Sequence, residues 1–541
     1  MTRQISFTFV LTFENTKNQT SSSILAYQIS ILASMRHLRY IAIIVFGITM
    51  TLPRNSLAQQ IQAVQFSSSD MASDLSQAKT FQKYPTYEQY LQMMQDFASD
   101  YPAICRLDTF GTSVEGRLLL ALKISDNVEM NEAEASFLYT STMHGDEIVG
   151  YVLLLRLADV LLKGYGNDNE ITGLVDKLEI WINPLANPDG SYSNDNGLSL
   201  QNSFRFNVND VDLNRDYPVP HRDRTNDPTG REIETRHMME FLDQHRFSLS
   251  ANIHSGEEVV NYPWDNTPYA HVDSTWFRFV AGEYADEAMA VDPDYMFGWP
   301  EGGIVHGYTW YQATGTRQDY ITYYLGGREL TLELSMEYRL LSSELEQHWN
   351  LNQRSLINYI SQCTYGIRGT VTDRISGDPL QARIRVIDHD LDQDRSMIYS
   401  SEDHGDFYRL MKEGVYDILI TSWGYQDQIV RNVSVQDYQA TILNVEMESW
   451  PNHVDESELP AFRLYPNPSS GLLYVEPENI SPGELILTIH SLDGKLMMSK
   501  KLFWHGGALE LDIDQLENGM YFVKTSIDSH QMVNSLLVID P

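Results

Sequence analysis

The chain has 541 residues, 42% of them hydrophobic, so it is long enough for about three domains with separate cores. Its formal net charge of −36 excludes general binding to nucleic acid, because the phosphate backbone would repel it. The same charge would attract cationic partners, or would only keep an extracellular protein soluble.

The N-terminal region has the pattern of a secretion signal. Basic residues within 35–39 precede an apolar stretch at 40–52, and small residues at 56–58 provide a cleavage site. The apolar stretch is shorter than the ~18 to 20 residues of a membrane span, so an anchor is the less favoured alternative, and no later stretch is long enough. We therefore predict a signal peptide at 35–58, an untranslated or disordered extension at 1–34, a linker or pro-segment at 59–79, and no transmembrane span in the mature chain.

Residues 80–363 alternate between helical and strand patterns. Apolar residues recur at helical spacing over 87–97 and again after Glu147. Strands are expected at 105–110, 118–124, 136–139, 179–183, 248–253 and 330–334. This alternation predicts an α/β domain with a central mixed sheet flanked by helices, and functional loops at the strand ends. Cys105 and Cys363 could form one disulfide bridge across this domain or remain two buried thiols.

The pattern His-x-x-Glu, which can bring an imidazole and a carboxylate to one metal ion, occurs three times. The copies are His144 with Glu147, His237 with Glu240, and His254 with Glu257. The second copy lies in a stretch with helical periodicity, which favours an ordinary helix surface. The first and third follow strand-like stretches, where α/β proteins place their sites. We therefore predict that His144, Glu147 and His254 bind one Zn²⁺ ion.

Other polar residues could support chemistry at such a metal. Arg205 and Arg215 lie ten residues apart, and an arginine fork can hold a carboxylate, to which Asn214 can add a hydrogen bond. Two solvated surface arginines are the alternative. Glu333 lies among leucines in an alternating strand, where a carboxylate is costly unless it serves as a general base. Tyr311, near a glycine, could close over a bound chain end or could simply pack.

Two smaller all-β regions are expected after the α/β domain. Residues 366–448 and 461–541 contain short alternating stretches between turn residues, and 449–460 form a linker with Pro and acidic residues. The four aspartates at 388, 390, 392 and 394 begin like a calcium loop, but Gln393 and Tyr399 replace the required Gly and Glu. We interpret this run as a solvated loop and predict two small all-β sandwich domains.

Six motifs occur in a familiar order. They are His144-Gly-Asp-Glu147, Asn187-Pro-Asp-Gly190, Asp212-Leu-Asn-Arg215, Asn252-Ile-His-Ser255, Trp310-Tyr311 and Thr331-Leu-Glu333. Together they resemble the M14 zinc metallocarboxypeptidases, particularly the regulatory N/E branch. The resemblance implies zinc ligands His144, Glu147 and His254, an oxyanion-stabilising Arg205 and a general base Glu333. It also implies that Asn214 and Arg215 bind the substrate's C-terminal carboxylate and that Tyr311 closes over the substrate.

The resemblance also implies a pocket for the departing side chain. In that branch an acidic residue at the position of Asp265 selects Lys or Arg, and Gln318 matches a polar wall of the pocket. Alternatively, Asp265 only caps a turn. The chain departs from the branch at Arg317, where Met is usual. Arg317 could neutralise Asp265 and admit neutral or acidic chain ends.

The two β regions carry resemblances of their own. Residues 366–448 resemble the transthyretin-like β-sandwich that follows the catalytic domain in this branch. Residues 461–541 resemble the C-terminal sorting domain of the type IX secretion system. The recognisable motif is Leu464-Tyr-Pro-Asn-Pro468, near the start of this region. That implies recognition by the secretion machinery, passage through the periplasm of a Gram-negative bacterium, and a secreted or cell-surface location.

The sequence thus predicts a secreted zinc metallocarboxypeptidase that removes the C-terminal residue, Lys or Arg, of peptides and proteins. An alternative is a peptidoglycan or other amide hydrolase on the same fold. Asn214 and Arg215 disfavour it, because both are suited to a free carboxylate. A non-catalytic peptide-binding or adhesive surface protein is an alternative of another class, but such a protein would be expected to lack Glu333 or a zinc ligand.

Overall fold

The computed structural model describes residues 65–193, 196–223, 225–450, 461–478, 483–492, 494–527 and 530–539. The predicted extension, the signal peptide and most of the linker at 449–460 lie outside these residues. Within them, no helix is both long and apolar enough to cross a membrane.

An eight-stranded mixed sheet forms the centre of the first domain, with the order β1-β2-β4-β3-β5-β8-β6-β7. The strands are β1 (Cys105–Thr112), β2 (Leu118–Ile124), β3 (Ala135–Ser141), β4 (Leu178–Asn183), β5 (Leu249–His254), β6 (Glu257–Tyr262), β7 (Ile304–His306) and β8 (Arg328–Ser335). Strands β4, β3, β5 and β8 run parallel to one another, and β6 pairs antiparallel with β8. The carboxyl ends of β3, β5 and β8 therefore meet at one edge.

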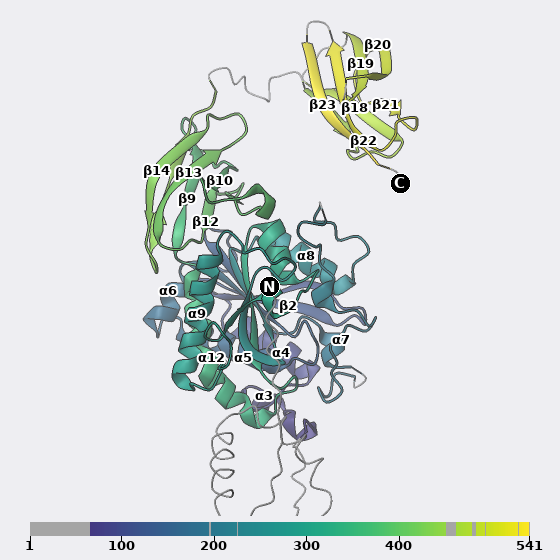
Figure 1. Ribbon diagram of the computed structural model, residues 1–541. Coiled ribbons are helices and arrows are strands. Elements are labelled where there is room, and N and C mark those ends of the chain that lie inside the picture. Colours follow the sequence, from purple (N-terminus) through teal and green to yellow (C-terminus); the bar gives the residue numbers. More distant parts are fainter. Residues whose placement is uncertain are drawn as a thin grey trace, which may run out of the picture. The chain divides into compact units, whose positions relative to one another are not determined.

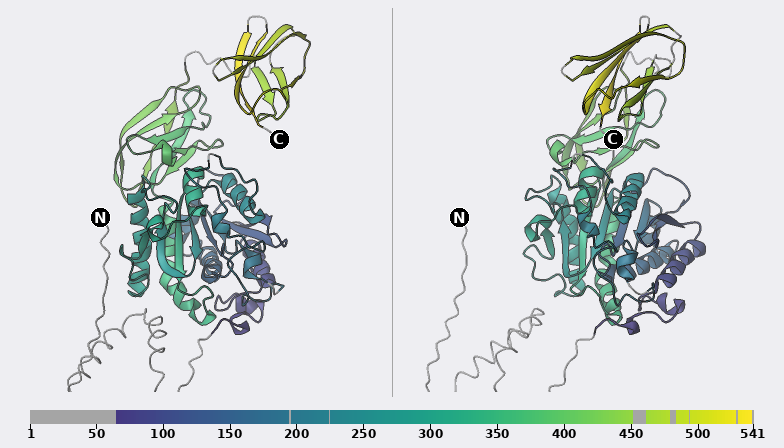
Figure 2. Two further views of the ribbon diagram at one scale, coloured as in Figure 1. Left: turned by 45° about the vertical axis from the view of Figure 1, so that its right-hand side comes forward. Right: turned by 90° about the vertical axis from the view of Figure 1, so that its right-hand side faces the viewer.

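Helices cover both faces of this sheet (Figure 1 and Figure 2). The longer helices are α4 (Tyr87–Asp100), α5 (Val149–Gly164), α6 (Asn169–Val175), α8 (Ile233–His245), α9 (Ser274–Val291) and α12 (Leu345–Gln362). Short helical turns are η1 (Ser68–Asp70), α3 (Leu75–Ala78), α7 (Pro188–Ser191), η2 (Leu213–Arg215), α10 (Gly307–Trp310), α11 (Arg317–Tyr320), η3 (Ile321–Leu325) and η4 (Ser342–Glu344).

The alternation of side chains along the strands explains the two layers. Phe137 and Tyr139 pack with α4, α5, α9 and α12, whereas Leu138 between them packs with α8 on the opposite face. Both faces are apolar, as is usual for parallel strands covered by helices on each side. The predicted α/β class is confirmed.

The segment before residue 80 differs from its prediction. Phe66, Met71 and Ala78 are buried in the main core of the α/β domain. The described part of the predicted linker or pro-segment, residues 65–79, is thus part of this domain. Sparse apolar residues in a Ser-rich stretch had concealed this, because only contacts with distant residues bury them. The two cysteines are free and buried, so they are separate thiols.

Two all-β domains follow, as predicted. The first contains β9 (Gly366–Asp373), β10 (Arg383–Val386), η5 (Asp392–Asp394), β11 (Ile398–Tyr399), β12 (Asp406–Arg409), β13 (Gly414–Thr421), β14 (Gln428–Val435), β15 (Ala440–Ile442) and β16 (Val445–Met447). The second contains β17 (Ala461–Tyr465), β18 (Leu472–Glu478), β19 (Gly483–Ser491), β20 (Leu496–Trp504), β21 (Leu509–Asp512), β22 (Gly519–Ile527) and β23 (His530–Val538). In each domain two sheets share one apolar core. The transthyretin-like character of the first stays a prediction.

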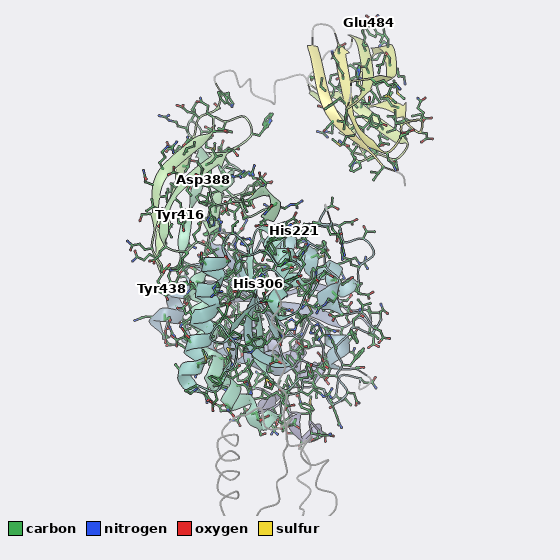
Figure 3. All side chains as sticks on the ribbon, in the orientation of Figure 1. His221, His306, Asp388, Tyr416, Tyr438 and Glu484 are labelled. Atoms are coloured by element: carbon green, nitrogen blue, oxygen red, sulfur yellow. The ribbon has the colours of Figure 1, made fainter. Side chains whose placement is uncertain are left out.

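The aspartate run in the first β domain is not a solvated loop throughout. Asp388 is exposed (Figure 3), but Asp390 and Asp394 are buried. The Asp390 carboxylate accepts hydrogen bonds from the backbone N–H of Val386 and the guanidinium of Arg409. Alternate aspartates of the run, Asp390 and Asp394, face inward, and Asp390 forms an ion pair with Arg409.

Candidate active site

The three predicted metal ligands lie together at the carboxyl edge of the sheet. His144 follows β3, Glu147 precedes α5, and His254 ends β5, which is the parallel neighbour of β3. Their ligand atoms all lie within 4.8 Å of one another, and all three side chains are buried. Adjacent parallel strands explain why residues 110 positions apart meet.

The donor atoms of this group face one another. His144 Nδ1 lies 2.8 Å from Glu147 Oε1, and His254 Nδ1 lies 2.6 Å from Glu147 Oε2. The two Nδ1 atoms are 3.1 Å apart. Burial lowers the pKa of His254 to about 4. Burial would also lower the pKa of His144, but the carboxylates of Glu147 and Asp212 raise it above its ordinary value. Two imidazole nitrogens and a carboxylate aimed at one point suit a divalent cation such as zinc.

Asp212 is a site residue that sequence reasoning missed. His144 Nε2 lies 2.9 Å from Asp212 Oδ1, and the tautomer with its proton on Nε2 would donate to this carboxylate and keep the Nδ1 lone pair for a metal. Arg205 Nε donates to Asp212 Oδ2 at 3.0 Å, and Arg205 Nη1 to Glu147 Oε1 at 3.1 Å. Burial would raise the pKa of Asp212, but His144 and Arg205 hold it well below its usual range. Its place at the head of the Asp-Leu-Asn-Arg motif was the available signal.

Glu333 lies beside the three predicted metal ligands. Strand β8 is parallel to β5, and its Glu333 pairs in register with His254. The side chain is 8% exposed, and its Oε2 has no hydrogen-bond partner among the described residues. Burial, followed by the charge of Glu147, raises the pKa of Glu333 well above its ordinary value, although Arg205 opposes this. A partner-free carboxyl with a raised pKa suits a group that accepts a proton.

The predicted carboxylate binders line the same cavity, whose volume is about 250 Å³. Asn214 and Arg215 belong to η2, and the Arg215 guanidinium lies 5.9 Å from the ring centre of Tyr311. Tyr311 is 47% exposed at the cavity mouth. The backbone N–H of Arg317 donates to Asn214 Oδ1 at 3.0 Å. This bond fixes the side-chain amide of Asn214 with its nitrogen directed away from Arg317.

Asp265 lies buried in the wall of this cavity. Its Oδ1 accepts hydrogen bonds from Asn261 Nδ2 at 3.1 Å and from Gln318 Nε2 at 3.3 Å. Gly307 is needed here, because a Cβ at that position would lie 1.9 Å from Asp265 Oδ1. Burial raises the pKa of Asp265. Asn261 and Asp265 line the cavity, and Gln318 contacts Asp265; we call these three residues the specificity pocket, after the role that the resemblance predicts for Asp265 and Gln318.

Arg317 does not point its charge at Asp265. Its Nε and Nη2 donate to the two carboxylate oxygens of Glu329 at 3.0 and 2.8 Å, and both side chains are fully buried. This bidentate ion pair with Glu329 neutralises the charge of Arg317 inside the domain. Arg317 therefore does not neutralise Asp265, and the arginine whose charge acts on that carboxylate is Arg215.

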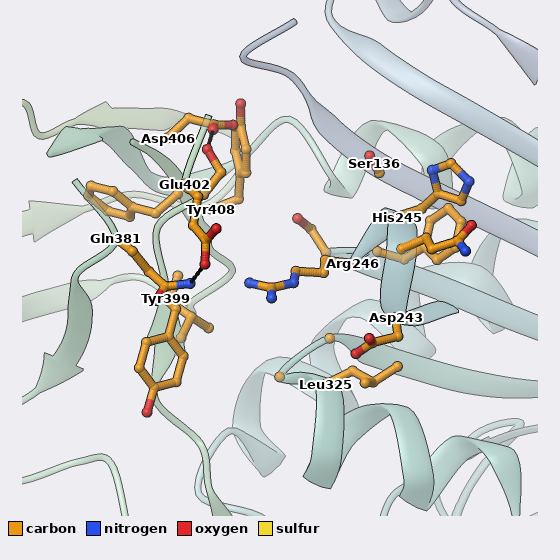
Figure 4. Close-up of a pocket in the computed structure, with 18 of the residues that line it drawn as sticks. Ser136, Asp243, His245, Arg246, Leu325, Gln381, Tyr399, Glu402, Asp406 and Tyr408 are labelled. Atoms are coloured by element: carbon orange, nitrogen blue, oxygen red, sulfur yellow. Dashed lines mark hydrogen bonds between the residues drawn. The ribbon is translucent and has the colours of Figure 1, made fainter. Parts of the chain in front are cut away.

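A larger cavity of about 800 Å³ lies elsewhere (Figure 4). Its walls include Ser136, Ser248 and Gly327, at the amino ends of β3, β5 and β8, and residues of the first β domain. Arg246 points across it toward the wall that carries Glu402. None of the predicted site residues lines it, so size does not identify the candidate active site here.

A sheet that presents two histidines and one glutamate at its carboxyl edge, beside a buried carboxylate, has the arrangement of an α/β protein with a catalytic-type zinc centre. Residues 90–355 match the family described as zinc carboxypeptidase, and residues 463–539 match the secretion system C-terminal sorting domain. The chain belongs to the zinc carboxypeptidase family. Its sorting domain indicates secretion and a surface or extracellular location.

Relatives agree with this assignment. Human carboxypeptidase D is 35% identical over 380 residues, which are 67% of this chain and 26% of that protein. The catalytic chain of human carboxypeptidase N is 30% identical over 407 residues, which are 68% of this chain and 86% of that protein. The chain thus spans about a quarter of carboxypeptidase D. The crystal structure of thrombin activatable fibrinolysis inhibitor matches with a TM-score of 0.47 and 17% identity, covering 54% of this chain and 78% of that chain.

Proposed function

We propose that this protein is a secreted zinc carboxypeptidase that removes a C-terminal Lys or Arg from peptides and proteins. The observation that carries the proposal is that one cavity of about 250 Å³ combines three groups. These are the metal ligands with Glu333, the carboxylate binders Asn214 and Arg215, and the buried carboxylate of Asp265. Each group alone has a structural explanation, but their convergence fits an exopeptidase.

One zinc ion would be held by His144 Nδ1, His254 Nδ1 and the carboxylate of Glu147, with Asp212 orienting His144. Zinc supplies Lewis acidity, which makes water a better nucleophile at neutral pH. Glu333 accepts the proton of the attacking water and then delivers it to the leaving amine. Arg205 donates hydrogen bonds to the negative charge that develops on the carbonyl oxygen.

The substrate's chain end is held by its carboxylate. Arg215 and Asn214 provide charge-assisted donors, and Tyr311 closes over the chain end from the mouth of the cavity. A free carboxylate is therefore part of what the site recognises. We expect C-terminally amidated peptides to be cleaved far more slowly than free ones, a comparison that also tests the rival amide hydrolase.

The specificity pocket contains acceptor atoms that no described donor reaches. Gln318 Oε1 and Asn261 Oδ1 are buried and have no hydrogen-bond partner among the described residues, and the Asp265 carboxylate lies beside them. Unpaired buried acceptors cost free energy until a donor arrives, and a Lys ammonium or Arg guanidinium brings several. An apolar side chain would bring none. This chemistry supports the basic specificity.

The decisive experiment compares peptides that differ only at the last residue, with and without a chelator. We expect chelation to abolish cleavage, and kcat/KM to be at least about 10-fold higher for Lys or Arg than for Leu or Phe. Asp265→Ala should remove this ratio while zinc content stays at the wild-type level. A wild-type preference for aromatic or acidic ends would refute the specificity, and chelator-resistant cleavage would refute the zinc mechanism.

The ends of the chain direct its export in this proposal. Residues 35–58 act as the signal peptide, so the protein crosses the periplasm, and the secretion machinery recognises residues 461–541. Among the described residues, the core of the catalytic domain includes side chains from Phe66 to Cys363.

A further inference from the structure

Strand β6 extends along the cavity on both sides of the reaction centre. Val259 pairs directly with Glu333 of β8, Asn261 with Thr331, and Glu257 with Ser335. Side chains two residues apart on a strand share a face, so Glu257 and Asn261 point to the same side as Glu333. Each lies about 7 Å along the strand from the register position of Glu333, in opposite directions.

The two ends of β6 therefore lie on opposite sides of the register position of Glu333. Asn261 belongs to the specificity pocket, which takes the departing residue. Glu257 lies at the other end, where the acyl part of the substrate must lie. Both residues line the cavity that holds the metal ligands.

Tyr338 completes this second end. It lines the same cavity and is 53% exposed. Its ring lies against Gly256, where an added Cβ would be 2.8 Å from a ring carbon, and Gly256 has a φ of +123° that favours glycine. A carboxylate and an aromatic ring thus line the same cavity near Gly256. Both attract a cation, the first by charge and the second through its π electrons.

The charge of Glu257 also acts at the reaction centre. Burial and the charge of Glu147 contribute most to the raised pKa of Glu333, and the charge of Glu257 adds to them. Glu257 therefore lies close enough to Glu333 to act on it electrostatically.

We propose that Glu257 and Tyr338 form an acyl-side subsite that takes a second basic side chain, from one of the two residues before the scissile bond. The enzyme would then favour chains that end in clustered basic residues. This inference rests on the proposed function and adds a determinant that is independent of Asp265.

The test uses zinc-loaded full-length protein and peptides that all end in Arg. The two residues before that Arg are Ala-Ala, Ala-Arg, Arg-Ala or Glu-Glu. Wild-type kcat/KM should be about 10-fold higher for the better Arg-containing peptide than for Ala-Ala, and lowest for Glu-Glu. Glu257→Gln should bring the first ratio close to one, and Glu257→Lys should favour Glu-Glu.

Glu258→Gln is the matched control, because Glu258 is the neighbouring residue on β6 and points to the opposite face. It should keep the wild-type ratios, and Glu257→Gln should keep the preference for Arg over Leu at the last position. Equal wild-type rates for Ala-Ala and Arg-containing peptides, or ratios unchanged in Glu257→Gln, would overturn the subsite.

Binding separates this inference from the proposed function. The dissociation constants of the same peptides are measured for Glu333→Gln protein with and without the Glu257→Gln change. If no peptide is cleaved by the wild type, the proposed function fails, but tighter binding of the Arg-containing peptides that depends on Glu257 still supports the subsite. Equal binding of all peptides would refute it.

Discussion

At the scale of single residues, Asp212 and Glu333 have opposite environments within one site. The charges of His144 and Arg205 hold the pKa of Asp212 low in spite of burial, whereas burial and the charge of Glu147 raise the pKa of Glu333. A carboxylate that stays ionised can orient a metal ligand, and one with a raised pKa can exchange a proton with substrate.

Glu333→Gln should lower kcat by at least about 100-fold, because the amide cannot accept the proton of the attacking water. The change keeps the size of the side chain, so zinc content and the thermal midpoint should not fall. Steady-state kinetics and metal analysis on the same sample measure this. A variant that retained a tenth of the wild-type kcat would disprove the role of general base.

Asp212→Ala should weaken zinc binding by about 10- to 100-fold, since His144 loses the partner that orients its ring. Competition with a chromophoric chelator gives the dissociation constant directly. Asp210→Asn, on the exposed loop just before, is the control and should bind zinc as the wild type does. Equal affinities in both variants would mean that Asp212 only supports Arg205.

At the scale of elements, the order of strands places the site. The parallel neighbours β3, β5 and β8 bring His144, His254 and Glu333 to one edge, and the antiparallel β6 adds Asn261 and Glu257 from the far side of β8. The short helix α11 then attaches to β8 through the Arg317–Glu329 pair. The backbone N–H of Arg317 also donates to Asn214 Oδ1, so α11, which bears Gln318, is attached both to β8 and to Asn214.

Arg317→Met should destabilise the protein by about 3–5 kcal/mol, because it leaves the Glu329 carboxylate buried without its cation. The double change Arg317→Met with Glu329→Gln should recover much of this loss. Denaturant unfolding measures both, and the Lys or Arg preference should persist in the folded variants. Loss of that preference in the double variant would instead connect Arg317 with the specificity pocket.

At the scale of the whole molecule, a buried ion cluster joins the α/β domain to the first β domain. Asp273, just before α9, accepts hydrogen bonds from Arg328 of β8 and from Arg409 of β12, and its Oδ1 lies 2.7 Å from His389 Nε2. The four side chains come from elements far apart in the sequence, and Asp390 adds a further carboxylate on Arg409. The two domains are therefore expected to unfold together.

Asp273→Asn should cost about 3–5 kcal/mol at pH 7, because two buried arginines lose their shared carboxylate. Burial would raise the pKa of Asp273, but Arg409 and Arg328 hold it well below its ordinary value of 3.8. A depressed pKa stabilises the fold above the unfolded value, and this stabilisation is lost as the pH falls toward the folded value. The difference between wild type and variant should thus shrink below about pH 4.

Unfolding curves over a pH series, followed by probes in each domain, measure this difference. Arg383→Gln, which removes a largely exposed contact with Asp392, is the control and should change stability by less than about 1 kcal/mol. Separate transitions for the two domains in the wild type would contradict the joint unfolding.

The sequence by itself determined the α/β class, the order of the domains and the family. It also placed His144 with Glu147, because a ligand pair three residues apart after an apolar strand is a local pattern. The second histidine could be selected because strand ends in such domains meet at one edge. The sequence could nominate Glu333 for a different reason, because a carboxylate among the leucines of a strand is costly unless it has a function.

Only the tertiary structure decided how those residues are supported. The contact of Asp212 with His144, the burial of Phe66 in the main core and the pairing of Glu257 with Ser335 all join distant parts of the chain. Arg317 is the clearest case, because its position beside Gln318 suggested a partner in Asp265, whereas the fold brings Glu329 to it. Which of two nearby carboxylates a buried arginine binds depends on the path of the backbone, and local sequence does not encode that path.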